Sequence, residues 1–263
     1  MKPWSILLIV IAGLTILMLL VHQTPTPVPL ESQAPKTGQK VPVIVELFTS
    51  EGCSSCPPAD RVLAELEKAQ PVTNAIIIAL GEHVDYWNDL GWADPFSSGA
   101  FSERQQTYAR AFNTDTYTPQ MVVDGQAEFV GNDSAKAISA ISKAARTQKA
   151  NLQITPVNQA TIKVTATEIP AQLNHAKLDI VLALTESHLQ TKVERGENAG
   201  RMLAHASVVR QLQVIGTAPT AEVKLRMEPQ WKRENLKAVA FLQERQSRRI
   251  LGATVQNLVE FRP

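Results

Sequence analysis

The stretch from Val43 to Arg61 constrains the fold more than any other part of the chain. It opens with a near-continuous apolar run rich in β-branched residues, which is typical of a strand buried on both faces. A turn containing Gly52 follows, and Cys53 and Cys56 then stand at Cys-x-x-Cys spacing ahead of apolar residues at helical intervals. The sequence therefore predicts a strand, a loop and a helix. Both sulfur atoms would lie near the helix start, where free backbone N–H groups and the helix dipole favour thiolate.

Cys53 and Cys56 are the only cysteines among the 263 residues. A disulfide within the molecule would therefore join these two residues, and two cysteines are too few for a disulfide scaffold or a four-cysteine zinc site. Lysine and arginine number 26 against 25 acidic residues, and 5% of the residues are aromatic. This composition gives no support to nucleic-acid binding.

The N-terminal segment, residues 1–22, reads as a membrane anchor. Trp4 to Val21 carry no charge, are mostly apolar, and reach about the minimum length of a membrane-spanning helix. A small-x-small cleavage site is missing, so we favour an uncleaved anchor over a cleaved signal peptide. The positive-inside rule then places the rest of the chain outside the cytoplasm, in a bacterial periplasm where the cysteines can oxidise. Residues 23–41 are rich in proline and predict an extended linker.

Residues 42–150 alternate predicted strands and helices in the order β-α-β-α-β-β-α. This order, with Cys-x-x-Cys after the first strand and Thr118-Pro119 opening the third, resembles the thioredoxin fold. The resemblance implies that Pro119 is cis and faces the cysteine pair. Pro57 departs from the pattern, because it directly follows the second cysteine and has no N–H to donate; we expect an irregular or late helix start there.

Residues 151–263 change character. Short β-rich runs recur from Leu152 to Leu258, separated by turn residues such as Pro156, Gly216 and Pro219. This pattern predicts an all-β sandwich domain, with the boundary between the two domains at residues 146–151.

Longer motifs resemble a family of secreted thioredoxin-like proteins, number 1223 in the domain-of-unknown-function series. The motifs are Glu46 to Asp60, His83 to Trp87, Leu90 to Trp92, Asp94 to Phe96, Tyr117 to Gln120 and Arg195 to Arg201. The resemblance covers residues 42–258 and implies the fold and export, but it names no substrate or activity.

The cysteine pair allows three interpretations. In thiol–disulfide exchange on exported proteins, Cys53 attacks as thiolate and Cys56 resolves the mixed disulfide, without a cofactor. The pair could instead be a static disulfide in a thioredoxin-like binding or assembly module. The third interpretation is a metal or copper site with His83 as an added ligand. We favour exchange as the activity.

Glu46 lies inside the predicted first strand, just behind the cysteines. Burial of a carboxyl group there would favour its protonated form. Thioredoxins keep a buried acid at a similar place as a proton relay for the resolving thiol, so Glu46 is a candidate for that role. The alternative is a structural acid bonded to the backbone or to Arg61.

Loops that follow parallel strands share one edge of the sheet, so several polar residues are expected beside the cysteines. The candidates for substrate binding are Glu51, His83, Asp85, Trp87, Thr118, Arg195 and Arg201. A histidine there could exchange protons or stabilise a thiolate. Alternatively, the loop with His83 serves packing, and the loop with the two arginines is a plain turn. We interpret His175, His188 and His205 as ordinary surface or core residues.

Overall fold

The structure is a computed structural model that describes residues 40–171, 173 and 177–260. The expected anchor, residues 1–22, and nearly all of the expected linker lie outside this part. The described residues belong to one compact unit. None of the described helices is long and apolar enough to cross a membrane.

The first half follows the predicted order of strands and helices. Its elements are β1 (Val41–Thr49), α1 (Cys56–Ala69), β2 (Ala75–His83), α2 (Gly99–Phe112), β3 (Gln120–Val123), β4 (Ala127–Val130) and α3 (Ser134–Ala144), with a short 3-10 helix at Asn88–Leu90. Strand β1 pairs in parallel with β2 and antiparallel with β3, and β3 pairs antiparallel with β4.

Helix α1 begins at Cys56 itself, with proline in its first turn. The expectation that Pro57 makes the start late is therefore wrong. The first N–H groups of a helix have no intrahelical partner, so a proline there costs no hydrogen bond. Ser98 caps α2 and Asp133 caps α3 through side-chain oxygens.

The second half is built of strands. They are β5 (Asn151–Pro156), β6 (Thr161–Thr167), β7 (Leu178–Glu186), β8 (Leu189–Lys192), β9 (Met202–His205), β10 (Val208–Thr217), β11 (Thr220–Lys224), β12 (Leu236–Glu244) and β13 (Ile250–Asn257). Short 3-10 helices lie at Arg233–Asn235 and Leu258–Glu260. Strands β8 and β9, at the ends of the loop with the two arginines, are not among the runs that the sequence predicts.

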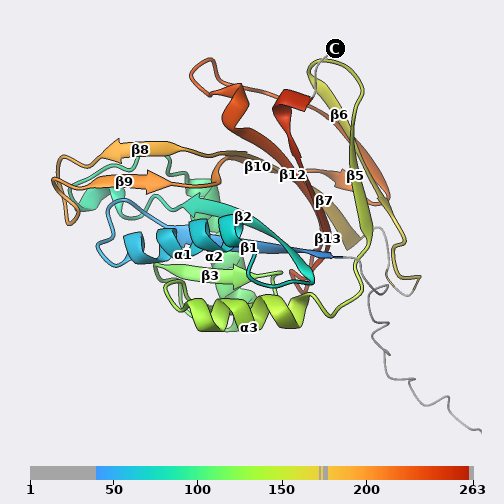
Figure 1. Cartoon of the computed structure of the whole chain (residues 1–263), viewed down its shortest axis with the longest axis horizontal. Helices are drawn as coiled ribbons and strands as arrows, with labels where there is room; N and C mark the ends of the chain where they lie inside the picture. Colours follow the sequence, from blue (N-terminus) through green and yellow to red (C-terminus); the bar gives the residue numbers. More distant parts are fainter. Residues whose placement is uncertain (1–39, 172, 174–176, 261–263) are drawn as a thin grey trace, which may run out of the picture. The chain divides into compact units, whose positions relative to one another are not determined.

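A single mixed sheet runs through both halves, in the order β13-β12-β7-β10-β2-β1-β3-β4 (Figure 1). The link is the parallel pairing of β10 with β2, where Val208 lies opposite Gly81. Strand β2 would otherwise be an unpaired edge, and β10 covers it. The two halves on either side of residues 146–151 thus share one sheet. Strands β11, β6 and β5 form a smaller sheet that packs on β7 and β12.

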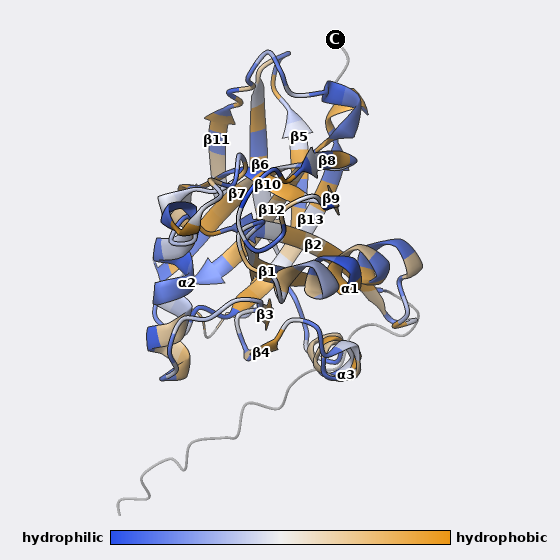
Figure 2. Ribbon diagram, turned by 90° about the vertical axis from the view of Figure 1, so that its left-hand side faces the viewer, coloured by the Kyte–Doolittle hydropathy of each residue, from blue (hydrophilic) through white to orange (hydrophobic). Residues whose placement is uncertain are grey.

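Side-chain alternation along β1 divides the large sheet into two faces. Val45 and Leu47 pack with α1 and α3, whereas Ile44 and Phe48 pack on the side of α2. Figure 2 shows apolar residues concentrated on the central strands between these layers. The same alternation decides which polar residues of β1 and β2 can reach the cysteines.

The β8–β9 hairpin is an insertion between the neighbouring strands β7 and β10. It forms its own two-stranded sheet, and β9 contacts α1. The loop at its tip, residues 193–201, therefore reaches the part of the molecule where the cysteines lie.

Candidate functional site

Cys53 and Cys56 form a disulfide at the start of α1, with Cα atoms 5.4 Å apart. The Cys56 N–H donates to the Cys53 carbonyl oxygen at 3.2 Å, which closes the small ring. Cys53 is 1% exposed and Cys56 0%. Both cysteines are therefore buried in the disulfide form.

The loop at residues 193–201 lies against the backbone beside the disulfide, and its central residue is Asn198. The side-chain amide of Asn198 is fully buried and donates to the backbone oxygens of Glu51, at 2.8 Å, and Cys53, at 3.0 Å. On the outer side, the Ser54 N–H donates to Glu197 Oε2 at 2.9 Å. This loop, which we call the cap, therefore binds the backbone on both sides of Cys53.

The two arginines of the cap have different surroundings. Arg201 Nη1 donates to Asn198 Oδ1 at 2.9 Å and so orients the amide, whereas Arg195 is exposed. The Glu51 carboxylate is bound by His205. The loop that carries both arginines lies at the cysteine edge.

A buried network of two histidines and two carboxylates lies beside the disulfide. His205 Nε2 lies 2.9 Å from Glu51 Oε1, and His83 Nδ1 lies 2.7 Å from Asp94 Oδ2. The Glu51 N–H donates to the same Asp94 oxygen at 2.8 Å, and Trp92 Nε1 donates to Glu51 Oε2 at 2.8 Å. The imidazole rings meet edge to face with centroids 4.9 Å apart. Two pairs are thereby joined into one network.

Asp60 lies near enough to both histidines to interact with them electrostatically. It lies one helical turn after Cys56, so the two side chains share a face of α1, and its Oδ1 accepts from Thr49 Oγ1 at 2.8 Å. Burial raises the pKa of Asp60, although the nearby His205 and His83 oppose this effect. Burial by itself would lower the pKa of His83, but the Asp94 carboxylate outweighs it and raises that pKa.

The remaining candidates of the cysteine edge have structural partners. Asp85 Oδ1 accepts from Ser102 Oγ at 2.6 Å and thereby fixes the first turn of α2. Trp87 packs against Gly52, and its Nε1 donates to Thr118 Oγ1 at 2.9 Å. The Thr118–Pro119 bond is cis, as predicted.

Glu46 does not lie behind the cysteines, and its expected role as their proton relay is wrong on geometric grounds. Its side chain points to the α2 face, whereas Cys56 begins the helix on the opposite face. Arg104 Nε donates to Glu46 Oε2 at 2.5 Å and Tyr108 Oη donates to Oε1 at 2.6 Å. The alternative partner, Arg61, is exposed.

Glu82 joins Glu46 in this second buried cluster, which the sequence did not predict. Its Oε1 lies 3.5 Å from Arg104 Nε, and within the described part of the chain neither carboxyl oxygen accepts a hydrogen bond. Burial, followed by the neighbouring Glu46 carboxylate, raises the pKa of Glu82 well above its ordinary value. A protonated Glu82 can donate to Glu46, which accounts for two carboxyl groups beside one guanidinium.

Sequence reasoning missed four residues of the site: Asp60, Asp94, Asn198 and His205. Asp60, Asp94 and Asn198 stand inside motifs quoted above, but nothing in the motifs marked their contacts. His205 lies 154 residues from Glu51, and the sequence carries no signal for that pairing. Of the other histidines, His188 is exposed, and His175 lies outside the described residues.

The geometry offers no ready set of metal ligands. Over the described residues, no three His, Cys, Asp or Glu side chains are grouped so that they could hold a metal ion. His83, the ligand that the metal interpretation requires, is bonded to Asp94, and the two cysteines are bonded to each other.

Comparisons with known proteins agree with this arrangement without naming an activity. The family model described as a protein of unknown function, DUF1223, matches residues 44–243. A solved structure from Agrobacterium tumefaciens is 25% identical, with a TM-score of 0.65, and the match covers 86% of this chain and 98% of that one. HBP35 of Porphyromonas gingivalis is 15% identical, with a TM-score of 0.59 and coverage of 87% and 78%, so it shows a similar fold alone. No protein with a curated description matches.

Proposed function

The chain belongs to the DUF1223 family, and we propose that it is an extracytoplasmic thiol–disulfide oxidoreductase acting on exported proteins. The observation that carries this proposal is the placement of the disulfide. It lies at the first turn of α1, beside a buried network of histidines and carboxylates that no fold requirement explains. Titratable groups with shifted pKa values cluster at functional sites more than elsewhere.

The fold supports a thioredoxin-like assignment for the first half. Strands β2, β1, β3 and β4 are adjacent in that order, α1 and α3 cover one face, and α2 covers the other. The β-rich second half packs two sheets face to face, as in a sandwich, and it also contributes the cap. In this proposal the second half therefore controls access to the disulfide of the first.

The proposed reaction proceeds through a mixed disulfide. A substrate thiolate attacks Cys53, the bond to Cys56 breaks, and a second substrate thiolate releases a substrate disulfide and the reduced Cys53–Cys56 pair. Two electrons pass from the substrate dithiol to the protein; the reverse reaction reduces a substrate disulfide. Because Cys53 is covered, the cap must release Asn198 before either direction can start.

The test uses the full chain and its Cys56→Ser variant, expressed with its export signal. Cys56→Ser should accumulate mixed disulfides with exported proteins, since the resolving thiol is absent, while Cys53→Ser should accumulate none. Non-reducing gels and mass spectrometry of the trapped species read the result. If Cys56→Ser traps no more than the double variant Cys53→Ser/Cys56→Ser, the proposal fails.

A second candidate is a binding or assembly module with a static disulfide, and the burial of both cysteines favours it. The reduction potential separates the two functions. A value below about −300 mV is typical of structural disulfides, whereas exchange catalysts lie above it. Export and anchoring belong to the proposal as well: mature protein recovered from membranes should retain residues 1–22, and a start near Gln23 would replace the anchor with a cleaved signal.

A further inference from the structure

We infer that an open pocket between α1 and the second half binds a short free peptide, recognised through its terminal carboxylate and its terminal ammonium group. The pocket has a volume of about 520 Å³. Its lining comes from α1, from the turns on either side of the β8–β9 hairpin, and from the chain around β12 and the end of β13. The exchange reaction makes no use of this pocket, and peptide binding is a separate function of the chain.

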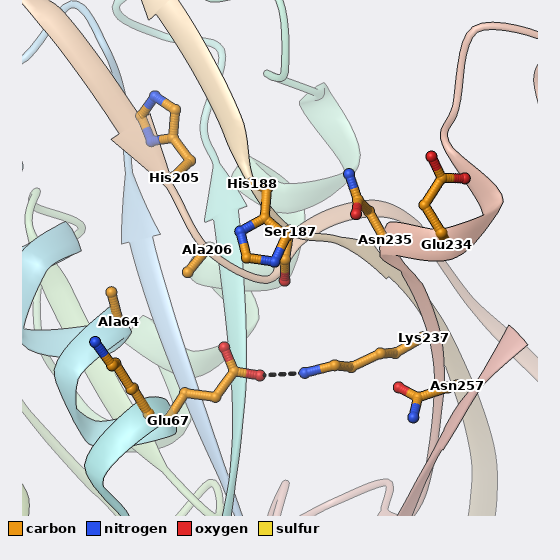
Figure 3. A pocket seen from close by; sticks show the side chains of 11 residues that line it. Ala64, Glu67, Ser187, His188, His205, Ala206, Glu234, Asn235, Lys237 and Asn257 are labelled. Atoms are coloured by element: carbon orange, nitrogen blue, oxygen red, sulfur yellow. Dashed lines mark hydrogen bonds and ion pairs between the residues drawn. The ribbon is translucent and has the colours of Figure 1, made fainter. Parts of the chain in front are cut away.

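The pocket lies at the junction of the two halves, away from the disulfide. On α1, Ala64 and Glu67 stand about two to three helical turns after Cys56. The other walls come from the second half, and Figure 3 shows His188 and Asn235 there, above Glu67. Ligand sites are clefts of about 300–1,000 Å³ with a few placed polar groups, and they often lie where two parts of a fold meet.

The carboxylate of Glu67 joins α1 to the second half inside the pocket. Lys237 Nζ donates to Glu67 Oε1 at 2.8 Å, and Ser207 Oγ lies 2.8 Å from each of the two Glu67 oxygens. In Figure 3 the Lys237 side chain reaches across the pocket to make this bond. An ammonium group has three N–H donors. Within the described residues Lys237 has no other partner, so donors remain for a ligand.

Several other polar side chains of the pocket have no partner within the part of the chain that the structure describes. They are those of Lys68, His188, Glu234 and Asn235. His188 has a φ of 62°, in the left-handed region that glycine adopts most freely. The turn nevertheless holds a histidine, and unusual backbone conformations of this kind cluster at ligand sites. The pocket thus offers polar groups that the fold itself does not use.

The charges of the pocket select the class of ligand. The positive charges are those of Lys68 and Lys237, and the negative charges are those of Glu67 and Glu234. Glu67 and Lys237 neutralise each other, which leaves Lys68 and Glu234 for the ligand. A molecule with one carboxylate and one ammonium group matches both, whereas a simple anion or cation leaves one of them unpaired. The side-chain amide of Asn235 can donate to and accept from peptide groups.

Isothermal titration calorimetry of the purified full chain tests the inference with three probes. They are trialanine, N-acetyl-trialanine, which lacks the ammonium group, and trialaninamide, which lacks the carboxylate. Trialanine should bind with a Kd of about 1 mM or lower, a range that a ligand of this size can reach. Each blocked peptide should bind at least about tenfold more weakly, because it loses one charge-assisted hydrogen bond.

Variants that remove a single charge assign the two ends of the peptide. Lys68→Gln should weaken trialanine binding about tenfold and leave trialaninamide binding unchanged. Glu234→Gln should weaken trialanine binding by a similar factor and leave N-acetyl-trialanine binding unchanged. Lys143→Gln on α3 and Glu65→Gln on the exposed side of α1 are the matched controls, and both should bind as the wild type does.

Absence of trialanine binding overturns the inference. Equal binding of trialanine and either blocked peptide overturns it too, since the pocket then recognises one end of a longer chain. Unchanged trialanine binding in both Lys68→Gln and Glu234→Gln would show that the peptide binds elsewhere. The double variant Cys53→Ser/Cys56→Ser should bind trialanine normally, so a failure of the exchange reaction leaves peptide binding untouched.

Discussion

At the scale of single residues, a shift of one position along a strand decides which face of the sheet a carboxyl group occupies. It therefore decides whether the group lies on the side of α1 and the disulfide or on the side of α2. Glu46 and Glu82 point to the α2 face, where Arg104 binds them, whereas Thr49 and His83 point to the α1 face and reach Asp60 and Asp94. Side chains alternate along a strand, so an acid one residue nearer the cysteines would have faced α1.

Glu82 makes the stability of the folded chain depend on pH. Its pKa is raised in the folded state, so its contribution is fully present below the ordinary value near 4.5 and is lost as pH rises through the folded pKa. Glu82→Gln mimics the protonated form. Between pH 5 and pH 8, the free energy of unfolding of wild type should fall by about 1–3 kcal/mol more than that of the variant. This difference is the cost of one buried polar group left without a hydrogen bond.

Urea unfolding at the two pH values measures this difference. Glu65→Gln, on the exposed side of α1, is the control and should leave the pH dependence unchanged. Equal pH dependence in Glu82→Gln and wild type would show that Glu82 is already charged in the folded state.

Local features of the site could be predicted from the sequence, and distant contacts could not. The cysteine spacing is a short motif, and the cis Thr118–Pro119 bond was expected from the resemblance to thioredoxins. The bonds of Asn198 to Cys53 and of His205 to Glu51 join residues 145 and 154 positions apart. No sequence periodicity indicates such pairs, so the contacts of Asn198 and His205 could not be predicted.

At the scale of elements, the β8–β9 hairpin carries the loop that is bonded to the backbone around Cys53. Its strands are short, and its tip is held by side-chain bonds of Asn198 and Glu197 to the loop around Cys53. Hairpins of two short strands are weak by themselves, so these bonds hold the tip in place. The strands of the larger sheet were predicted from apolar runs, but β8 and β9 are too polar and short to give that signal.

Removal of the Asn198 amide should expose the disulfide. Asn198→Ala loses two hydrogen bonds worth about 0.5–1.5 kcal/mol each, which lowers the free energy of cap opening. Dithiothreitol should then reduce the disulfide about tenfold faster at pH 7, since about 1.4 kcal/mol corresponds to a factor of ten. Stopped samples, alkylated and analysed by mass, give the rate.

Arg195→Ala is the matched control in the same loop, because Arg195 is exposed and should leave the rate unchanged. Arg201→Ala should fall between the two, since Arg201 only orients Asn198. Identical rates in Asn198→Ala and wild type would mean that another segment limits access to Cys53.

At the scale of the whole molecule, the shared sheet makes the two halves depend on each other. Strand β10 covers the edge of β2, and the Gly81 N–H donates to the Ser207 carbonyl oxygen at 2.8 Å. The change of composition at residue 151 correctly indicated that the chain becomes rich in β-strands there. It could not show that the new strands continue the old sheet, because strand pairing across the chain leaves no local trace.

Residues 40–150 expressed alone should therefore aggregate or stay partly unfolded. The fragment exposes the edge of β2 and the apolar face that normally contacts β12 and β13, and bare edges template association between chains. Size-exclusion chromatography and circular dichroism of the fragment, beside residues 40–260, test this expectation. A monomeric, cooperatively folding fragment would show that the first half is an independent domain.

The distance along the chain between the disulfide and its cap also has a consequence in time. Cys53 precedes Asn198 by 145 residues. At synthesis rates of about 5–20 residues per second, the cysteines leave the ribosome roughly 7–30 s before the residue that will cover them. A nascent chain thus passes through an interval in which its cysteine pair is open to any oxidant it meets, and the pair becomes enclosed only when the last third of the protein arrives.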